Sequence, residues 1–380
     1  MLKSRSPSFS VISGAQVHGL LSGHESTVVS LIEDTYRLHG EGSTVNPDSY
    51  FLRFPEQPSD RIIALPASVR GGVNVHGMKW ISSFPANVAN GLPRASAVLI
   101  LNDAQTGYPF ACLESSIISA SRTAASAALA ASALSKGRGA QPRRVAFIGA
   151  GLIARYVHTY LDANGFVFDE IGVHDTSPEH ARGFAGYLEG TGDVSIVIHQ
   201  HAEEAIRASD LVVFATVAGK PHVYDTNWFA HCPLVLHLSL RDLAPEVILG
   251  SWNVVDDIEH CLKADTSPHL AEQATGGRDF IAGTLYDVLT GRVTPPDDQP
   301  VIFSPFGLGV LDLAVAKFIY DQIASTGELT FVPDFFHDTK RYPQIEEYSP
   351  YVQIPEQPAT LGRLLLASGL RRRHDLQRLR

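Results

Sequence analysis

The chain has 380 residues, 44% of them hydrophobic and 18% charged, and its formal net charge is −10 at pH 7. This balance excludes a mainly disordered chain, and the acidic charge argues against a nucleic-acid partner, which a broad basic face would bind. The length favours two domains. The three cysteines (Cys112, Cys232 and Cys261) form no close pair in the sequence, which excludes a disulfide scaffold and a thiolate zinc ribbon.

The sequence predicts no membrane segment. The N-terminus lacks an apolar run of signal-peptide length. The least charged long stretch, residues 108–134, is interrupted by Glu114 and Arg122. We therefore expect a cytoplasmic protein with no membrane partner.

The first third of the chain combines strand-like runs with one long helix. Residues 61–66, 73–81 and 95–101 are strand-like, and a turn at 102–107 follows the last of them. Residues 114–136 are rich in Ala and Ser and contain no proline, which predicts a helix whose small side chains let neighbouring elements approach closely. We expect this helix to be central and packed.

The middle of the chain has the pattern of a doubly wound α/β domain. Apolar runs alternate with helix-length spacers, at residues 144–149, 170–175, 194–199, 211–216 and 233–238. Parallel strands need such crossover connections, and their sheet is buried on both faces. Segments dense in Gly and Pro bracket this region. The predicted division is a Rossmann-type doubly wound domain at 138–300, inserted in an α+β domain at 1–137 plus 301–330, with a partly disordered extension at 331–380.

The sharpest local pattern is a glycine-rich turn between a predicted strand and a helix, Ile148-Gly-Ala-Gly-Leu-Ile-Ala154. Gly149 permits the tight turn, Gly151 removes the side chain where a pyrophosphate approaches the helix, and Ala154 still permits close packing. The alternative is a glycine turn without a ligand. The combination of strand, turn and helix favours a dinucleotide site at Gly149, Ala150, Gly151, Leu152 and Ile153.

Further cofactor contacts are predicted at the ends of later strands. Asp175 ends the second strand, where its carboxylate can accept hydrogen bonds from both ribose hydroxyls and would repel a 2′-phosphate. NAD is therefore favoured over NADP. Thr216 and Val217 end a strand at the carboxyl edge of the sheet, and we assign them to the nicotinamide half. Ser239 is a further predicted cofactor contact. The alternative for Thr216 is that it only caps the following turn.

The first segment also supplies basic residues that suit an acidic substrate: Arg53, Arg61, Lys79, Arg94 and Arg122. Arg122 lies on the predicted packed helix, where an unpaired guanidinium would be costly. Either an internal carboxylate such as Glu114 neutralises it, or a substrate carboxylate does so in a bidentate pair. Salt bridges would explain each residue singly, but the set beside a dinucleotide domain favours an amino-acid substrate.

Asp242 is the candidate general acid/base. It follows a predicted strand at the carboxyl edge of the sheet, where a carboxylate could take a proton from an amine or activate water. The alternative is that Asp242 caps a helix that begins near Ala244. No metal site is predicted, because His231, Cys232 and His237 flank a strand and the sequence has no His-Glu-x-x-His pattern.

The order of these motifs resembles the ornithine cyclodeaminase/mu-crystallin family. Besides Lys79 and the glycine turn, the resemblance rests on Asn102-Asp-x-x-Thr-Gly107, on Ser121-Arg-Thr-Ala-Ala-Ser126 and on Ser304-Pro-Phe-Gly-Leu-Gly-Val-Leu-Asp-Leu313. It implies a homodimer built through the non-nucleotide domain, with NAD(P) in the inserted domain. The implied site residues are Arg53, Lys79 and Arg122 for the substrate carboxylate, Asp242 with Lys79 for catalysis, and Asp312 near the nicotinamide.

One branch of the family is the most similar. The Asp242 segment reads Leu-Arg-Asp-Leu-Ala-Pro, whereas ornithine cyclodeaminases carry a Gly-Asp-Cys-Pro-Gly-Lys-like loop, so ornithine cyclisation is disfavoured. This segment, with residues 60–66, 79–81 and 94–103, resembles the N-(2-amino-2-carboxyethyl)-L-glutamate dehydrogenases, which make 2,3-diaminopropionate for siderophores and peptide antibiotics. Their substrate has three carboxylates, which Arg94 and Arg241 would suit.

The resemblance implies NAD-dependent oxidative cleavage of this substrate to L-2,3-diaminopropionate and 2-oxoglutarate. Two alternatives stay open. One is an ornithine cyclodeaminase or another amino- or imino-acid dehydrogenase of the family. The other is a non-catalytic NAD(P)- or ligand-binding protein similar to mu-crystallin.

Overall fold

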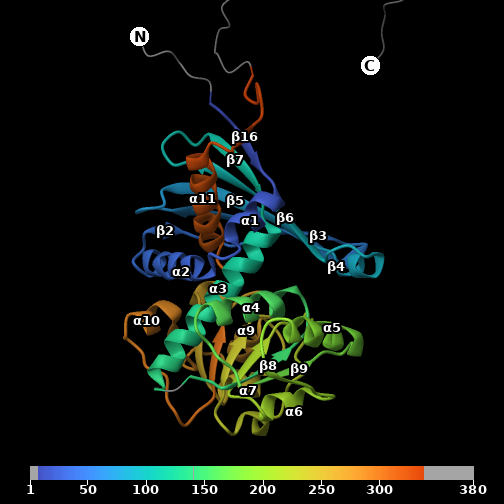
Figure 1. Cartoon of the computed structure of the whole chain (residues 1–380). Helices are drawn as coiled ribbons and strands as arrows, with labels where there is room; N and C mark the ends of the chain where they lie inside the picture. The colour runs from blue at the N-terminus through green and yellow to red at the C-terminus, as the bar shows by residue number, and fades with distance from the viewer. Residues whose placement is uncertain (1–6, 140, 338–380) are drawn as a thin grey trace, which may run out of the picture. The chain divides into compact units, whose positions relative to one another are not determined.

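The computed structural model describes residues 7–139 and 141–337, which form two β-sheets with helices packed on them (Figure 1). We call them the mixed sheet and the parallel sheet. The predicted extension at 331–380 is described only as far as residue 337, so the expected disorder beyond it lies outside the described residues.

The mixed sheet has the strand order β16-β1-β7-β6-β5-β4-β2, with β3 paired to β4. Its neighbours are antiparallel except for β1 and β7. The strands are β1 (Ser10–Ile12), β2 (Thr44–Val45), β3 (Tyr50–Phe54), β4 (Gln57–Val69), β5 (Val75–Ser83), β6 (Ala95–Asp103), β7 (Pro109–Glu114) and β16 (Thr330–Phe331). The associated helices are α1 (Gly14–Leu21), α2 (Glu25–Gly40), η1 (Pro85–Asn90) and α11 (Gly309–Thr326), of which α11 packs on β4, β5 and β6.

The parallel sheet has the order β10-β9-β8-β11-β12-β15-β13-β14, and every pair in it is parallel. The strands are β8 (Arg144–Ile148), β9 (Glu170–His174), β10 (Ser195–Ile198), β11 (Leu211–Phe214), β12 (Leu234–His237), β13 (Trp252–Val255), β14 (Ile281–Thr284) and β15 (Val301–Ser304). The helices are α4 (Leu152–Ala163), α5 (Pro178–Glu189), α6 (Ala202–Arg207), η2 (Thr226–Phe229), α7 (Pro245–Leu249), α8 (Ile258–Cys261), α9 (Ser267–Thr275) and α10 (Leu285–Leu289). The predicted Rossmann-type fold class is confirmed.

One predicted domain boundary is wrong by a strand. Residues 301–304 were expected to return to the substrate-binding domain, but they form β15, which lies between β12 and β13 in the parallel sheet. All four residues of β15 are buried, as a central strand covered on both faces requires. The chain therefore leaves the parallel sheet after Ser304.

The long predicted helix is α3 (Ser116–Gly137), and it packs against elements of both sheets, including α2, α4, β6 and β12. Its alanines are buried except for Ala133, which is half-buried, and this confirms a central packed helix. It is long and apolar enough to cross a membrane by composition alone, but most of it is buried inside the protein, as expected for a core helix.

The strand order of the parallel sheet reverses direction at β8. The chain runs outward from β8 to β9 and β10, and then crosses to β11 on the other side of β8. Ligands of doubly wound sheets bind at such a reversal, outside the carboxyl ends of the strands. The loops after β8, β9, β11, β12 and β15 therefore define the candidate site.

Candidate active site

The turn between β8 and α4 is shaped for close approach of a ligand. Gly149 has φ +95°, and a Cβ on it would lie 2.7 Å from the carbonyl oxygen of Ala215, so this position requires glycine. Gly151 is the N-cap of α4, and a Cβ there would meet no atom within 4 Å. The N-terminus of α4 is unobstructed, and its backbone N–H groups and dipole suit a pyrophosphate.

Asp175 follows β9 and holds this turn in place. Its Oδ2 accepts a hydrogen bond from the backbone N–H of Ala150 at 2.8 Å, and its Oδ1 accepts one from that of Ser177 at 2.8 Å. The structure thus brings together the predicted glycine turn and its acidic partner. Leu152 and Val217 present exposed apolar side chains nearby in the fold, and Ile153 is half-buried in the first turn of α4. These residues fit a dinucleotide.

Asp242 is the centre of a polar network at the same edge of the sheet. Its side chain is 0% exposed. Its Oδ1 accepts hydrogen bonds from Thr216 Oγ1 and from His222 Nε2, the latter at 2.9 Å, and its Oδ2 accepts one from Ser239 Oγ. Burial would raise the pKa of Asp242, but the contacts with His222, His237 and Ser239 hold this pKa well below its usual range. Asp242 is therefore ionised.

The contacts also decide between the alternatives for two of these residues. The N-cap of α7 is Ala244, and Asp242 does not cap that helix. Thr216 Oγ1 accepts a hydrogen bond from the backbone N–H of Ala218 at 3.1 Å, so Thr216 caps its turn and also binds Asp242. The predicted contacts of Thr216, Val217 and Ser239 with the nicotinamide half stay predictions.

Lys79, Arg122 and Asp312 meet in the core, where β5, α3 and α11 pack together. Lys79 Nζ lies 2.8 Å from Asp312 Oδ2 and donates to Ser119 Oγ at 3.2 Å, and Arg122 Nε donates to Asp312 Oδ1 at 3.3 Å. Asp312 is thus the internal carboxylate that partners Arg122, whereas Glu114 accepts hydrogen bonds from the first backbone N–H groups of α3. Two cations share one carboxylate, which leaves positive charge for a substrate.

The loop between β15 and α11 fixes Arg122 from the other side. Asp256 is buried and accepts hydrogen bonds from the backbone N–H groups of Phe306 at 3.0 Å and Gly307 at 2.7 Å. Burial raises the pKa of Asp256, although these donors lower it. Gly307 has φ +97°, and a Cβ on it would lie 2.6 Å from Arg122 Nη1. The guanidinium therefore packs directly on the backbone of this loop.

Four arginines gather where the β3–β4 hairpin approaches the Asp242 segment, and we call Arg53, Arg61, Arg94 and Arg241 the arginine cluster. Arg53 pairs with Arg61 across the hairpin, and Arg94 Nη1 donates to Ser83 Oγ at 2.8 Å. Burial and then the charges of Arg94, Arg241 and Arg53 lower the pKa of Arg61. No carboxylate among residues 7–139 and 141–337 pairs with Arg61 or Arg94. Arg241 is partly compensated, because it faces the Asp265 carboxylate and donates to the backbone carbonyl oxygens of Asp265 and Ala264. The cluster therefore carries an excess of positive charge.

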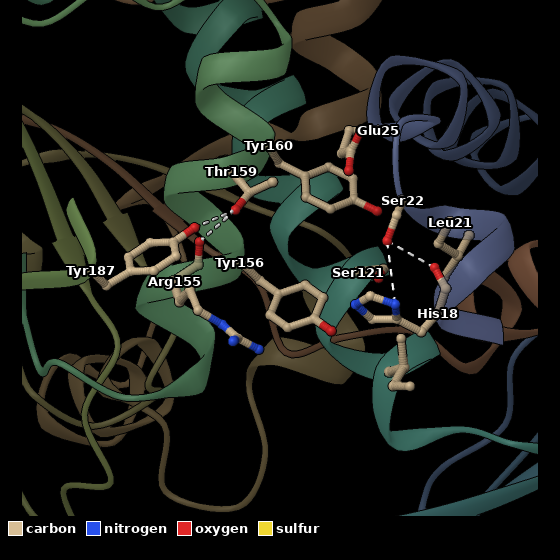
Figure 2. Close-up of a pocket in the computed structure, with 11 residues that line it drawn as sticks. His18, Leu21, Ser22, Glu25, Ser121, Arg155, Tyr156, Thr159, Tyr160 and Tyr187 are labelled. Atoms are coloured by element: carbon tan, nitrogen blue, oxygen red, sulfur yellow. Dashed lines mark hydrogen bonds between the residues drawn. The ribbon is translucent and has the colours of Figure 1, made fainter. Parts of the chain in front are cut away.

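A separate pocket of about 190 Å³ lies among α1, α3, α4 and α5 (Figure 2). Figure 2 shows Tyr156 and Tyr160 projecting from α4 toward α1, with Tyr187 of α5 on the other side of Arg155. The Tyr160 hydroxyl is buried and makes no hydrogen bond with a described residue. None of the predicted site residues lines this pocket, so the candidate site does not include it.

Sequence reasoning missed two histidines of the Asp242 network. His222 binds Asp242 directly, and the buried His237 lies 3.3 Å from Asp242 Oδ2 through its Nε2 and 3.2 Å from Ser304 Oγ through its Nδ1. His237 was rejected as a metal ligand and given no other role. His222 lies six residues after Thr216 in an irregular loop, and no spacing rule connects it to a carboxylate twenty residues later.

Comparison with known proteins agrees with this architecture. Residues 17–327 match the model of the ornithine cyclodeaminase/mu-crystallin family. The N-((2S)-2-amino-2-carboxyethyl)-L-glutamate dehydrogenase of Staphylococcus aureus (strain NCTC 8325 / PS 47) is 29% identical over 309 residues, which cover 79% of this chain and 90% of that protein. The alanine dehydrogenase of Archaeoglobus fulgidus is 28% identical over 324 residues, covering 83% and 95%.

Among solved structures, an archaeal alanine dehydrogenase dimer with bound NAD superposes with a TM-score of 0.76. It is 26% identical, and the match covers 86% of this chain and all of that one. The expectation of an NAD-dependent enzyme is thus confirmed at the level of the family. The site residues are not tested by these matches, and they enter below as proposals.

Proposed function

The chain belongs to the ornithine cyclodeaminase/mu-crystallin family, and we propose that it oxidises N-(2-amino-2-carboxyethyl)-L-glutamate with NAD and water to L-2,3-diaminopropionate, 2-oxoglutarate, NADH and a proton. The S. aureus relative with this activity supports the choice. We place the reaction in the cytoplasm, where it would supply an amino acid for a siderophore or peptide natural product.

The observation that carries this proposal is the arginine cluster. Alanine and ornithine have one carboxylate each, which Lys79 and Arg122 could hold without further cations. The proposed substrate has three carboxylates. Arg53 and Arg94 would bind the two that Lys79 and Arg122 do not hold, and Arg61 and Arg241 lie beside them. Arginine is suited to such pairs because its fork of donors binds a carboxylate through two bonds.

The remaining roles follow from the geometry of each group. Gly149, Ala150, Gly151, Leu152 and Ile153 would hold the pyrophosphate, Asp175 the ribose, and Thr216, Val217 and Ser239 the nicotinamide half. Asp312 would lie near the nicotinamide and fix Lys79 and Arg122, the two cations that it pairs with. When bound, the nicotinamide accepts the hydride from the glutamate α-carbon. Lys79 and Arg122 would orient that carbon through its carboxylate, and Asp242 would provide the centre for proton transfer.

We also propose a homodimer through the mixed sheet. The face away from α11 carries large exposed apolar side chains, including Trp80 and Val98, which are opposite each other in the β5–β6 register. Met78 and Ile100 form the next pair on that face. Exposed apolar patches on soluble proteins commonly mark interaction sites, and symmetric dimers are the commonest oligomers. The dimeric archaeal relative supports this reading.

The test is NADH absorbance and 2-oxoglutarate formation with N-(2-amino-2-carboxyethyl)-L-glutamate, beside L-alanine and L-ornithine. We expect equal amounts of NADH and 2-oxoglutarate from the first substrate only. Arg94→Met should lower kcat/KM about 10- to 100-fold, the loss expected for one hydrogen-bonded charge pair, while Arg70→Met, an exposed control at the end of β4, should leave it unchanged.

Other outcomes would select another function. NADH from alanine alone would make the chain an alanine dehydrogenase. Proline and ammonia from ornithine without net NADH would make it a cyclodeaminase. Binding of NAD without turnover of any of the three would favour the non-catalytic alternative.

A further inference from the structure

His222 and Asp242 are joined by the backbone as well as by their side chains. The backbone N–H groups of His222 and Val223 donate to the carbonyl oxygen of Asp242 at 2.9 and 3.0 Å, and Val223 forms a β-bridge with Leu243. The side chains meet at 2.9 Å between His222 Nε2 and Asp242 Oδ1. The backbone hydrogen bonds between the two chain segments therefore fix the position of the His222 side chain against Asp242.

The two side chains differ in their access to a ligand. The Asp242 side chain is fully buried, whereas that of His222 is 41% exposed. Both oxygens of Asp242 already accept hydrogen bonds from Thr216 and Ser239, so a substrate amine would have to displace a donor to reach them. His222 is the most exposed member of this network, since Thr216 and Ser239 are half-buried and Asp242 and His237 are buried.

The contact also sets the protonation of the imidazole. Asp242 is ionised and can only accept, so His222 Nε2 carries the proton and donates it. In the neutral ring, Nδ1 is then the free base. No hydrogen bond to Nδ1 occurs within residues 7–139 and 141–337, which leaves this atom available to a ligand.

We propose that His222 Nδ1 is the group that exchanges protons with the substrate amine, and that Asp242 is a positioning residue that fixes and stabilises the imidazole. This inference rests on the proposed function and refines its proton-transfer step. His222 takes a proton from the substrate ammonium, which frees the nitrogen lone pair to assist departure of the α-hydrogen as hydride to NAD. Water then adds to the carbon of the resulting iminium and loses a proton to solvent.

The same atom serves the second half of the reaction. His222 returns its proton to the nitrogen as the C–N bond of the carbinolamine breaks, and the proton of the carbinolamine hydroxyl passes to the departing amine as the ketone forms. Diaminopropionate leaves with a protonated amine. The balance is one water consumed, one hydride transferred and one proton released. The exposure of His222 allows this exchange with solvent.

The test compares His222→Gln with Asp242→Asn and a control, His24→Gln. Glutamine can still donate to Asp242 but cannot shuttle protons. We expect kcat to fall about 100-fold or more, the usual contribution of a general acid/base, with the NAD dissociation constant within twofold of wild type. The pH dependence of kcat/KM should lose one limb. His24 is exposed and makes no side-chain cap bond, so its variant should match wild type.

Chemical rescue separates catalysis from a structural role. Imidazole should restore part of the kcat of His222→Ala, whereas Asp242→Asn should not respond, because added imidazole would lack its carboxylate partner. Retention of more than a third of wild-type kcat by His222→Gln, with an unchanged pH profile, would overturn the proposal. If the His222→Gln variant is insoluble, the kcat of His222→Ala and its rescue by imidazole test the proposal instead.

Failure of the proposed function gives a different result. If wild type oxidises another amino acid of the panel but not N-(2-amino-2-carboxyethyl)-L-glutamate, the substrate assignment is wrong, and the same variants test His222 on the amino acid that reacts. A wild-type protein that binds NAD but turns over no member of the panel would overturn both.

Discussion

Lys79 Nζ and Asp312 Oδ2 lie 2.8 Å apart in a fully buried pair that ties β5 to the first turn of α11. Asp312 also accepts from Arg122, so a single carboxylate compensates two cations from different elements. Its position at the N-terminus of α11 favours a negative charge. Asp312 therefore holds Lys79 and Arg122, the two cations proposed to bind the substrate carboxylate, in place without a ligand.

Replacing this carboxylate should be costly. Asp312→Asn leaves two buried cations without an anion, and we expect the free energy of unfolding to fall by about 3–5 kcal/mol. Asp321→Asn is the matched control, because Asp321 pairs with Lys317 on the same helix at 2.6 Å but lies on the surface, where such pairs contribute about 0–1 kcal/mol. Urea unfolding of both variants measures the difference. Equal losses would contradict the assigned role of Asp312.

The pH dependence of the free energy of unfolding should report on the protonation of Lys79. Burial lowers its pKa from 10.5 to about 8, although Asp312 partly offsets this and Arg122 adds to it. The unfolded chain binds more protons than the folded one between about pH 8 and 10.5, so the contribution of Lys79 to stability rises with pH across that window.

Substrate affinity should fall as the pH rises, whereas the contribution of Lys79 to stability increases. Above about pH 8 the free enzyme loses the Lys79 charge, and KM for the proposed substrate should rise because its carboxylate loses a cationic partner. Steady-state kinetics from pH 6.5 to 9.5 measure this. Lys79→Met should have a high KM at every pH and no such dependence, and a wild-type KM that stays flat to pH 9.5 would show that the lysine charge is not used.

The glycine turn and Asp175 were predictable because their chemistry is local. Gly149 is dictated by a backbone conformation, and Asp175 follows the next strand, where dinucleotide-binding strand-helix-strand units commonly carry their acidic residue. Asp312 was assigned to the site only through the family resemblance. Its pairing with Lys79 joins positions 233 residues apart, and no periodicity or spacing encodes such a contact.

The exposed partner of Asp242 was unpredictable for a related reason. His222 lies in an irregular loop, where neither helical nor strand periodicity says which way a side chain points. β15 shows what the sequence could not predict about the fold, because Val-Ile-Phe-Ser is compatible with a strand in either sheet. Only the packing of its neighbours β12 and β13 places it in the parallel one.

Gly307 should be essential for the shape of the substrate site. Alanine at this position would be strained at φ +97° and would place its Cβ 2.6 Å from Arg122 Nη1. We expect Gly307→Ala to raise KM at least tenfold. Gly327→Ala separates the two effects, because Gly327 has φ +76° but no atom near its Cβ position. The Gly327→Ala variant should lose about 1–2 kcal/mol of stability, and its KM should equal that of the wild type. Equal kinetic effects would mean that backbone strain alone is responsible.

The Tyr160 hydroxyl in the pocket of Figure 2 should contribute little to stability. It is buried and makes no hydrogen bond of normal geometry with a described residue, although Ser121 lies close enough to interact with it, so removing it also removes a desolvation cost. We expect Tyr160→Phe to be neutral or stabilising by up to about 1 kcal/mol. Tyr36→Phe is the control, because Tyr36 Oη lies 3.0 Å from Ser126 Oγ in a buried hydrogen bond, and it should cost about 1 kcal/mol. Thermal unfolding of the two variants and the wild type measures these changes in stability.

The proposed dimer makes a prediction about one face of the mixed sheet. Val98→Glu places a charge opposite Trp80, in the middle of the apolar face, and desolvating that charge would cost more than the contact provides. We expect the wild type to have the mass of a dimer in light scattering and Val98→Glu that of a monomer. Val167→Glu, at an exposed apolar residue after α4, should remain dimeric. A wild-type monomer at micromolar concentration would remove the dimer from the proposal, and the exposed apolar face would then need another partner.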